Sequence, residues 1–271
     1  WAAILFDYAS YTLYPTPSPM LTLPRSVRHL LFLLLLGSTA LLGLSVLAAA
    51  MARPCRVAGV SADCPNLVTD LTPLIVALVF WVASLATWRL ERHTLSAFFL
   101  SLVAAILVTG TLTTIVPETV EEVTLLFYLH LAALPPVMYH FHKRLTQHPA
   151  LPAPRWSRLV LYLLLAGAVV LTGLLVVGLL ADSSLFRIAR LGSRLSLILG
   201  LLCVGGLLWH RYREPTSGSI KRRIRLISFG TLLAFAPLFL LSMLPDTLGL
   251  PYAVPYSSTF VLLMLSPVLY L

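Results

Sequence analysis

The stretch LVLYLLLAGAVVLTGLLVVGLL, residues 159–180, decides the fold class of this chain. It contains no Asp, Glu, Lys, Arg or His, and its only polar side chains are those of Tyr162 and Thr172. A helix needs about 20 consecutive apolar residues to cross the hydrocarbon core of a bilayer. The stretch is long enough to do so, and we therefore predict a membrane-spanning helix over these residues.

Similar apolar stretches lie on both sides of it along the chain. Together they predict an all-α fold, a polytopic membrane protein built as a bundle of about eight transmembrane helices. The other predicted spans are about Leu30–Met51, Leu71–Trp88, Leu95–Val116, Val123–Tyr139, Leu195–Trp209, Ile224–Leu244 and Tyr256–Leu271.

The composition excludes a soluble globular protein. Apolar residues make up 59% of the chain and charged residues 11%, whereas soluble domains carry roughly 25% charged residues. The residues left between the predicted spans are too few for a soluble catalytic or receptor domain. The net charge of +9 does not indicate nucleic-acid binding, because no basic stretch is interleaved with aromatic residues.

The distribution of basic residues predicts the orientation. If eight spans alternate across the membrane, 14 of the 19 Lys and Arg residues fall on one side. Loops rich in Lys and Arg remain in the cytoplasm. We therefore expect both termini to be cytoplasmic, in a multi-pass protein of the inner (plasma) membrane.

The chain divides into two parts of unequal length. Residues 1–27 are rich in tyrosine and proline, and we interpret them as a linker at the membrane edge or the end of a truncated helix. Residues 28–271 form the predicted eight-helix transmembrane domain. Because the chain starts at Trp1 and stops inside an apolar run, we expect it to be part of a longer protein.

No Asp, Glu, Lys or Arg lies near the middle of a predicted span. Ion pumps and proton-coupled transporters normally need such residues inside the bundle. His130 is the one ionisable residue well inside a span, and we interpret it as a polar intramembrane contact. The sequence has no phosphate-binding glycine loop, zinc-ligand spacing or nucleophile elbow, so we predict no catalytic residue, no metal and no cofactor.

His140 and His142 lie near the end of the fourth predicted span, two residues apart. This spacing places their rings about 200° apart around a helix, which suits one metal ion poorly. With Lys143 and Arg144 beside them, we interpret this segment as a solvated, basic helix end.

Cys55 and Cys64 lie in one predicted external loop. An external location permits a disulfide, and Asp63 and Pro65 favour a turn that brings the two cysteines together. We therefore predict that they pair.

Two clusters of charge lie on the predicted external side. The arginines are three and four residues apart and share one helical face. If the third and sixth spans are neighbours, the clusters can meet and form an input site for an external ligand. The alternatives are a salt-bridged cap and a contact with lipid headgroups. The residues of this candidate site are Glu118, Glu121, Glu122, Arg187, Arg190 and Arg194.

Small residues and prolines predict details of helix packing. Gly192, Ser196 and Gly200 form a ridge that permits close approach of another helix. Pro237 and Pro267 are expected to kink the last two spans, because proline removes a backbone donor.

Two further stretches carry a resemblance to a known family. Residues 129–142, LHLAALPPVMYHFH, resemble the histidine-rich end of an internal helix in ComP-like membrane sensor histidine kinases. Residues 219–225, SIKRRIR, followed by Gly230, Pro237 and the terminal SPVLYL of residues 266–271, are similar to the basic run and the last two helices of that family. The resemblance covers about the second half of the chain.

The resemblance implies the membrane-embedded input region of a bacterial two-component sensor kinase. Such a region passes an external or membrane signal to a cytoplasmic output domain in cis, and the parent protein transfers phosphate to a response regulator, often as a homodimer. The histidine-bearing helix and the ATP-binding domain are absent from this chain, so no catalytic residue falls within it. The alternatives are a small-solute transporter and a non-catalytic membrane anchor; in each case the bilayer is a partner.

Overall fold

The computed structural model describes residues 25–51, 67–90, 93–114, 120–146, 154–181, 183–214, 218–248, 250 and 263. Within these ranges the chain is helical and contains no strand. The elements are α2 (Arg25–Met51), α3 (Leu67–Arg89), α4 (His93–Thr114), α5 (Val120–Leu145), α6 (Arg155–Ala181), α7 (Ser183–Arg213), α8 (Gly218–Pro237), the π-helix η2 (Leu238–Met243) and α9 (Leu244–Thr247). The predicted all-α class is confirmed.

Five of the described helices are long and apolar enough to cross a membrane, judged by length and composition. These spans agree with five of the eight predicted ones, and they indicate a multi-pass membrane protein. They are His29–Ala48, Leu71–Arg89, Arg155–Ala181, Ser184–Arg213 and Ile224–Leu241. Helices α4 and α5 correspond to the third and fourth predicted spans, but they are not among the five helices that are long and apolar enough. The eighth predicted span, residues 256–271, lies outside the described part apart from Leu263.

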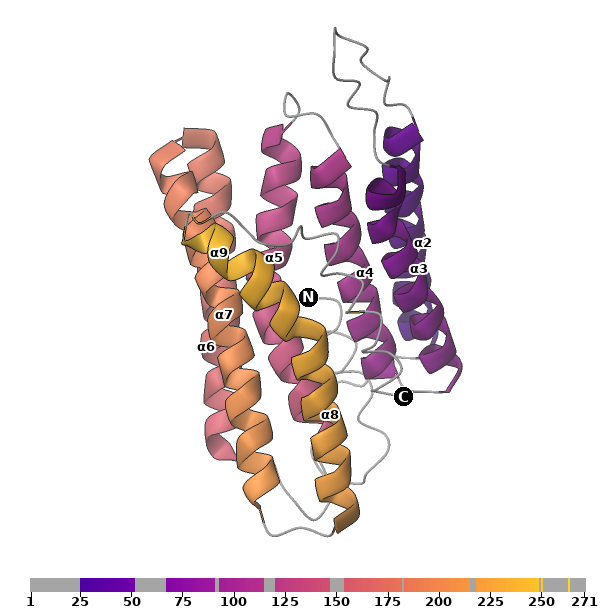
Figure 1. Ribbon diagram of the computed structural model, residues 1–271, viewed down its shortest axis with the longest axis vertical. Helices are drawn as coiled ribbons and strands as arrows, with labels where there is room; N and C mark the ends of the chain where they lie inside the picture. The colour runs from indigo at the N-terminus through magenta and orange to yellow at the C-terminus, as the bar shows by residue number, and fades with distance from the viewer. Residues whose placement is uncertain are drawn as a thin grey trace, which may run out of the picture.

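The helices pack in two groups of three. Helices α2, α3 and α4 contact one another, as do α5, α6 and α7, and the α4–α5 interface joins the groups. At that interface the rings of Phe98 and Phe141 stack with centroids 3.9 Å apart. Helix α8 packs on α7, and Figure 1 shows the helices running along the long axis of the molecule.

Successive helices run in opposite directions (Figure 1), so the loops alternate between the two ends of the bundle. We call the end at which α3, α5 and α7 finish the basic end, because Arg89, Arg144 and Arg213 lie there. At the opposite end α6 turns into α7 within two residues, between Ala181 and Ser183. The helix ends that carry these arginines are therefore at one end of the bundle, as the predicted orientation requires.

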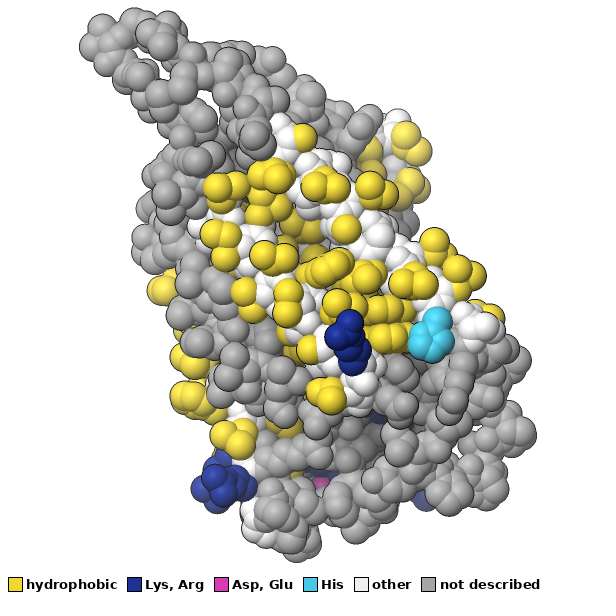
Figure 2. All heavy atoms as spheres, turned by 90° about the vertical axis from the view of Figure 1, so that its right-hand side faces the viewer, with side chains coloured by type: hydrophobic (Ala, Val, Ile, Leu, Met, Phe, Trp, Pro, Cys, Tyr) yellow, Lys and Arg dark blue, Asp and Glu magenta, His cyan; other side chains and the backbone are white. Residues whose placement is uncertain are grey.

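Apolar side chains cover much of the outer surface. Leu33, Leu34 and Leu41 of α2 are exposed, as are Leu159 and Leu163 of α6. Figure 2 shows hydrophobic side chains over most of the described part of one face. A soluble protein rarely exposes apolar patches of this extent, so a lipid bilayer is the environment that this surface fits.

Helix α7 is longer than the sequence pattern predicts. We expected a span over about Leu195–Trp209 with Arg187, Arg190 and Arg194 on one helical face outside it, but a single helix, α7, runs from Ser183 to Arg213. The prediction is wrong at this end because arginine is a good helix former. Its apolar stem and its guanidinium group can both pack against neighbouring helices.

The predicted glycine ridge lies at close helix contacts. A Cβ atom on Gly200 would lie 2.6 Å from the Cβ of Pro135 in α5, and one on Gly192 would lie 2.7 Å from a methyl group of Leu171 in α6. Gly200 lies against the backbone and ring of a proline, which cannot move aside, so that position requires glycine. At Gly192 the nearest atom is the end of a flexible leucine side chain, so the close approach is confirmed there without an equal requirement for glycine.

Pro237, where we predicted a kink, is the residue at which the α-helical pattern changes. The α-helical hydrogen-bond pattern of α8 ends at this residue and a π-helix of six residues follows. Proline has no N–H to donate to the carbonyl one turn earlier, and a π-helical segment accommodates the interruption. Pro267 lies outside the described residues.

The orientation can be tested by cysteine labelling. In a chain whose native cysteines are replaced by serine, we expect Arg213→Cys to be protected from a membrane-impermeant thiol reagent in intact cells. Glu121→Cys should be labelled, since it lies at the opposite end. Permeabilised cells, in which both positions become accessible, are the control. Labelling of Arg213→Cys together with protection of Glu121→Cys would reverse the orientation.

Candidate functional site

A cluster of arginine and aromatic side chains joins α5 and α7 near the opposite end of the bundle. The guanidinium of Arg194 donates a 2.8 Å hydrogen bond to the hydroxyl oxygen of Tyr128. The guanidinium carbon of Arg190 lies 4.9 Å from the centroid of the Tyr128 ring and 5.9 Å from that of Phe186. We call Tyr128, Phe186, Arg190 and Arg194 the arginine–tyrosine cluster.

The local sequence explains this geometry. Phe186, Arg190 and Arg194 are four residues apart and therefore lie on one face of α7. Tyr128 is buried in a small core with Leu175 and Ala189, so packing holds its ring in place, with one ring face toward Arg190 and the hydroxyl toward Arg194. A cation over an aromatic face contributes about 0.5–1 kcal/mol where exposed and more where water is excluded.

The structure describes only part of the predicted input site. Arg190 and Arg194 are half-buried in the cluster, whereas Arg187 is exposed. Glu118 lies outside the described residues, and Glu121 and Glu122 are described only as backbone in the first turn of α5. The meeting of the acidic and basic triads therefore stays a prediction.

We expected the acidic and basic clusters to meet through contact of the third and sixth spans, but the structure brings different helices together. Helix α7 packs mainly against α5 and α6 rather than against α4. Helices α5 and α7 both run from the opposite end to the basic end, with Tyr128 beside Arg194. Glu121 precedes Tyr128 by about two helical turns, as Arg187 precedes Arg194. The backbone at Glu121 and that at Arg187 are therefore at similar heights.

The other predicted sites are described unevenly. His130 is half-buried in α5, ten residues after the start of that helix at Val120. Cys55 and Cys64 lie outside the described residues, so their disulfide is untested. Among the residues that the structure describes, no three His, Cys, Asp or Glu side chains are grouped so that they could hold a metal ion.

A second polar site, near the basic end, was missed by the sequence analysis. His142 of α5 is fully buried. Its Nδ1 donates to the carbonyl oxygen of Met138 at 2.8 Å, and its Nε2 lies 2.9 Å from the hydroxyl oxygen of Thr231 in α8. That hydroxyl is also 2.8 Å from the carbonyl oxygen of Ile227. The His142–Thr231 contact is a polar tie between α5 and α8.

The hydroxyl of Thr231 has one hydrogen, so the tie has two possible directions. If Thr231 donates to Ile227, then Nε2–H of His142 must donate to Thr231 and the ring is an imidazolium. If Thr231 donates to Nε2, the ring is neutral. The position of one proton therefore sets the direction of the hydrogen bonds between the two helices.

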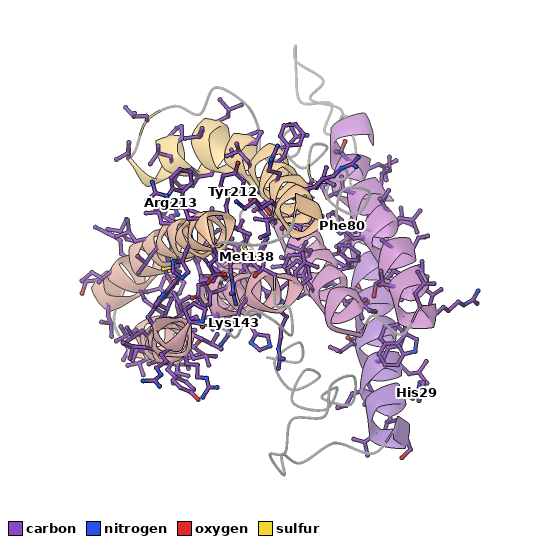
Figure 3. All side chains as sticks on the ribbon, turned by 90° about the horizontal axis from the view of Figure 1, so that it is seen from below. His29, Phe80, Met138, Lys143, Tyr212 and Arg213 are labelled. Atoms are coloured by element: carbon purple, nitrogen blue, oxygen red, sulfur yellow. The ribbon has the colours of Figure 1, made fainter. Side chains whose placement is uncertain are left out.

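This finding corrects our interpretation of the end of α5 as solvated. His140, His142 and Lys143 are all buried, because α5 continues to Leu145 inside the bundle. The Phe98 ring of α4 lies edge-on to the His142 ring, with centroids 6.3 Å apart. Figure 3, viewed from the basic end, shows Met138 near the middle of the bundle.

An ion pair lies at the end of α7, at the same end of the bundle. Arg211 is fully buried, and its Nη1 lies 2.8 Å from Oε2 of Glu214. The Nε2 atom of His210 lies 3.5 Å from the other carboxylate oxygen of Glu214. The His210 ring in turn lies edge-on to the Trp156 ring of α6, with centroids 5.5 Å apart. The spacing of Arg211 and Glu214 is a sequence signal for this pair, whereas nothing local indicates that Thr231 meets His142.

Comparison with known proteins gives no relative for this chain. No family model, no curated protein and no solved structure matches it.

Proposed function

We propose that this chain is the membrane-embedded input region of a bacterial two-component sensor kinase. It passes an external or membrane signal through α5, α7 and α8 to a cytoplasmic output domain in cis. The parent protein then transfers phosphate to a response regulator. The proposal rests on the resemblance of residues 129–142 and 219–271 to ComP-like sensors and on the placement of two polar contacts.

The observation that carries the proposal is that α5 bears a polar interhelical contact near each of its ends. Tyr128 bonds to Arg194 of α7 and His142 contacts Thr231 of α8. The two residues are 14 positions apart, or about 21 Å along a helix. A ligand that displaces Arg190 or Arg194 from Tyr128 at one end would shift α5 relative to α7, and the His142–Thr231 tie would pass this shift to α8.

The external site in this proposal is the arginine–tyrosine cluster together with Arg187 and the acidic residues Glu118, Glu121 and Glu122. Arginine binds a carboxylate through two parallel hydrogen bonds. A ligand carboxylate is therefore able to replace the contacts that Arg190 and Arg194 make with Tyr128. An anionic or peptide ligand is the chemical class that this site fits.

The test uses the full-length protein reconstituted in vesicles with ATP and its response regulator. We expect acid-labile phosphate on histidine, and we expect Arg190→Glu, Tyr128→Phe and Thr231→Val each to change its level by about two- to tenfold. This range corresponds to the loss of one hydrogen bond in a coupled equilibrium. Protein yield and membrane insertion should be unaffected.

Two matched controls accompany these variants. Tyr162→Phe removes a hydroxyl from an exposed position of α6. Thr39→Val removes a buried threonine hydroxyl whose bonds are to Leu35 and Leu36 of its own helix. Neither should alter phosphorylation. Vesicles that carry no phosphohistidine but show solute flux would favour the transporter, and vesicles with neither would favour the membrane anchor.

A further inference from the structure

A long cavity lies between α7 and α8, with a volume of about 630 Å³. Volumes of about 300–1,000 Å³ are typical of small-molecule sites. Its floor includes the buried side chains of Val204, Leu208 and Phe235. Leu202, Trp209 and Leu232 also line it and are exposed, so the cavity is a groove that opens on the outer surface of the bundle.

The groove has the length of one lipid leaflet. On α7 it extends from Ile198 to Tyr212, and on α8 and the following η2 it extends from Arg225 to Phe239. Each range covers 14 helical steps, or about 21 Å. One half of a bilayer's hydrocarbon core is about 15 Å thick. The groove can therefore accommodate an extended acyl chain and reach the headgroup region.

The polar groups of the groove gather at its basic end. Arg225 lines the groove there, with its guanidinium carbon 5.8 Å from the Tyr212 ring centroid. The guanidinium carbon of Arg213 lies 4.7 Å from the ring centroid of Trp209, another lining residue. Figure 3 shows Tyr212 and Arg213 on α7 beside α8. Aromatic residues and arginines in this arrangement are typical of the membrane–water interface.

Among the residues that the structure describes, no acidic side chain lines the groove to balance the charge at this end. Glu214, the nearest acid along α7, is engaged by Arg211 and His210, and none of these three lines the groove. The rest of the lining is apolar apart from Ser228 and Thr231. An occupant with one anionic end and a long apolar body matches this distribution.

We propose that the groove between α7 and α8 binds an anionic phospholipid from the leaflet at the basic end. Its acyl chain lies along Val204, Leu208 and Phe235, and its phosphate is bound by Arg225. Arginine suits this role because its planar guanidinium matches phosphate geometry. This inference goes beyond the proposed function and does not depend on it.

Two adjacent glycines give a matched pair of variants. A Cβ atom added at Gly205 or at Gly206 meets nothing within 4 Å, and both residues are exposed. Only Gly205 lines the groove. Gly205→Leu should therefore fill the groove without disturbing the fold, whereas Gly206→Leu adds the same side chain outside it.

The experiment measures lipid binding to the purified full-length protein by native mass spectrometry. The probes are phosphatidylglycerol and phosphatidylcholine with the same acyl chains, and glycerol phosphate without chains. We expect the protein to prefer phosphatidylglycerol, and Gly205→Leu to weaken its binding by about tenfold or more while Gly206→Leu does not. Arg225→Gln should remove the preference over phosphatidylcholine. Glycerol phosphate alone should not bind.

Several results would overturn the proposal. Equal binding of lipid to Gly205→Leu and Gly206→Leu would show that the groove is not the site. An unchanged headgroup preference in Arg225→Gln would remove the role of the arginine. Tight binding of glycerol phosphate would point to a free phosphate compound in place of a lipid. A groove that takes up no lipid in the wild-type protein would point to a second copy or a segment of the same protein as its occupant. Unaltered thermal unfolding of each variant in detergent shows that the fold is intact.

Discussion

Replacing Gly178 by alanine is expected to lower the midpoint of thermal unfolding in detergent by roughly 2–12 °C. A Cβ atom at this position of α6 would lie 2.5 Å from the backbone nitrogen of Phe186 and 2.7 Å from its Cα. These atoms belong to the backbone of α7 and cannot rotate away. The two helices must separate, which costs about 1–3 kcal/mol, and for a protein of this size each kcal/mol lowers the midpoint by about 2–4 °C.

Gly173 of the same helix is the matched control. A Cβ atom there meets nothing within 4 Å. Alanine is favoured over glycine within a helix by roughly 0.5–1 kcal/mol. Gly173→Ala should therefore leave the midpoint unchanged or raise it slightly. If both variants behave alike, α6 and α7 do not approach as closely as the structure places them.

Gly178 also illustrates what the sequence predicts about the fold and what it does not. The run 159–180 predicts the end of α6 to within one residue and its start to within four, because length and apolarity alone determine a spanning helix. The position of Gly178 within that run gives no indication that Phe186 lies against it. Helix pairing depends on side-chain shapes from two segments, and each apolar helix offers several faces that are equally able to pack.

Charged residues limit the prediction in another way. The predicted span begins at Leu195 because arginine is not expected inside an apolar helix, so Arg187, Arg190 and Arg194 lie outside that span. In the structure these residues form the first turns of α7, and Tyr128 offers a hydroxyl and a ring face to Arg190 and Arg194. Their shared helical face was predictable from their spacing, but the partner on α5 was not.

The basic end shows the same limit for buried polar groups. His142 and Arg211 are fully buried, although we interpreted the segment of His142 as a solvated helix end and Arg211 lies beyond the apolar span predicted to end at about Trp209. Their burial depends on Thr231, Glu214 and the aromatic residues of other helices, which compensate the loss of water. The sequence shows that a residue is polar, but it does not show which residues of other helices lie beside it in the fold.

The Arg211–Glu214 pair gives the second large expected effect, and the two partners should not be equivalent. Arg211 is fully buried, whereas about 21% of the Glu214 side chain is exposed. Glu214→Gln leaves a buried guanidinium without its carboxylate, and breaking a buried pair in this way costs about 3–5 kcal/mol. Arg211→Met leaves a carboxylate that water and His210 can reach, so its cost should be nearer 1 kcal/mol.

The double variant, Arg211→Met with Glu214→Gln, separates the cost of leaving one charge unpaired from the cost of losing the ion pair itself. It removes both charges and keeps similar volumes, and replacing a whole buried pair by an apolar one is often neutral. Unfolding midpoints in detergent should therefore fall most for Glu214→Gln and recover when Arg211→Met is added. The recovery is a coupling energy of the kind that a double-mutant cycle measures. If the two single losses simply add, Glu214 does not compensate the buried charge of Arg211, and another group near the basic end must do so.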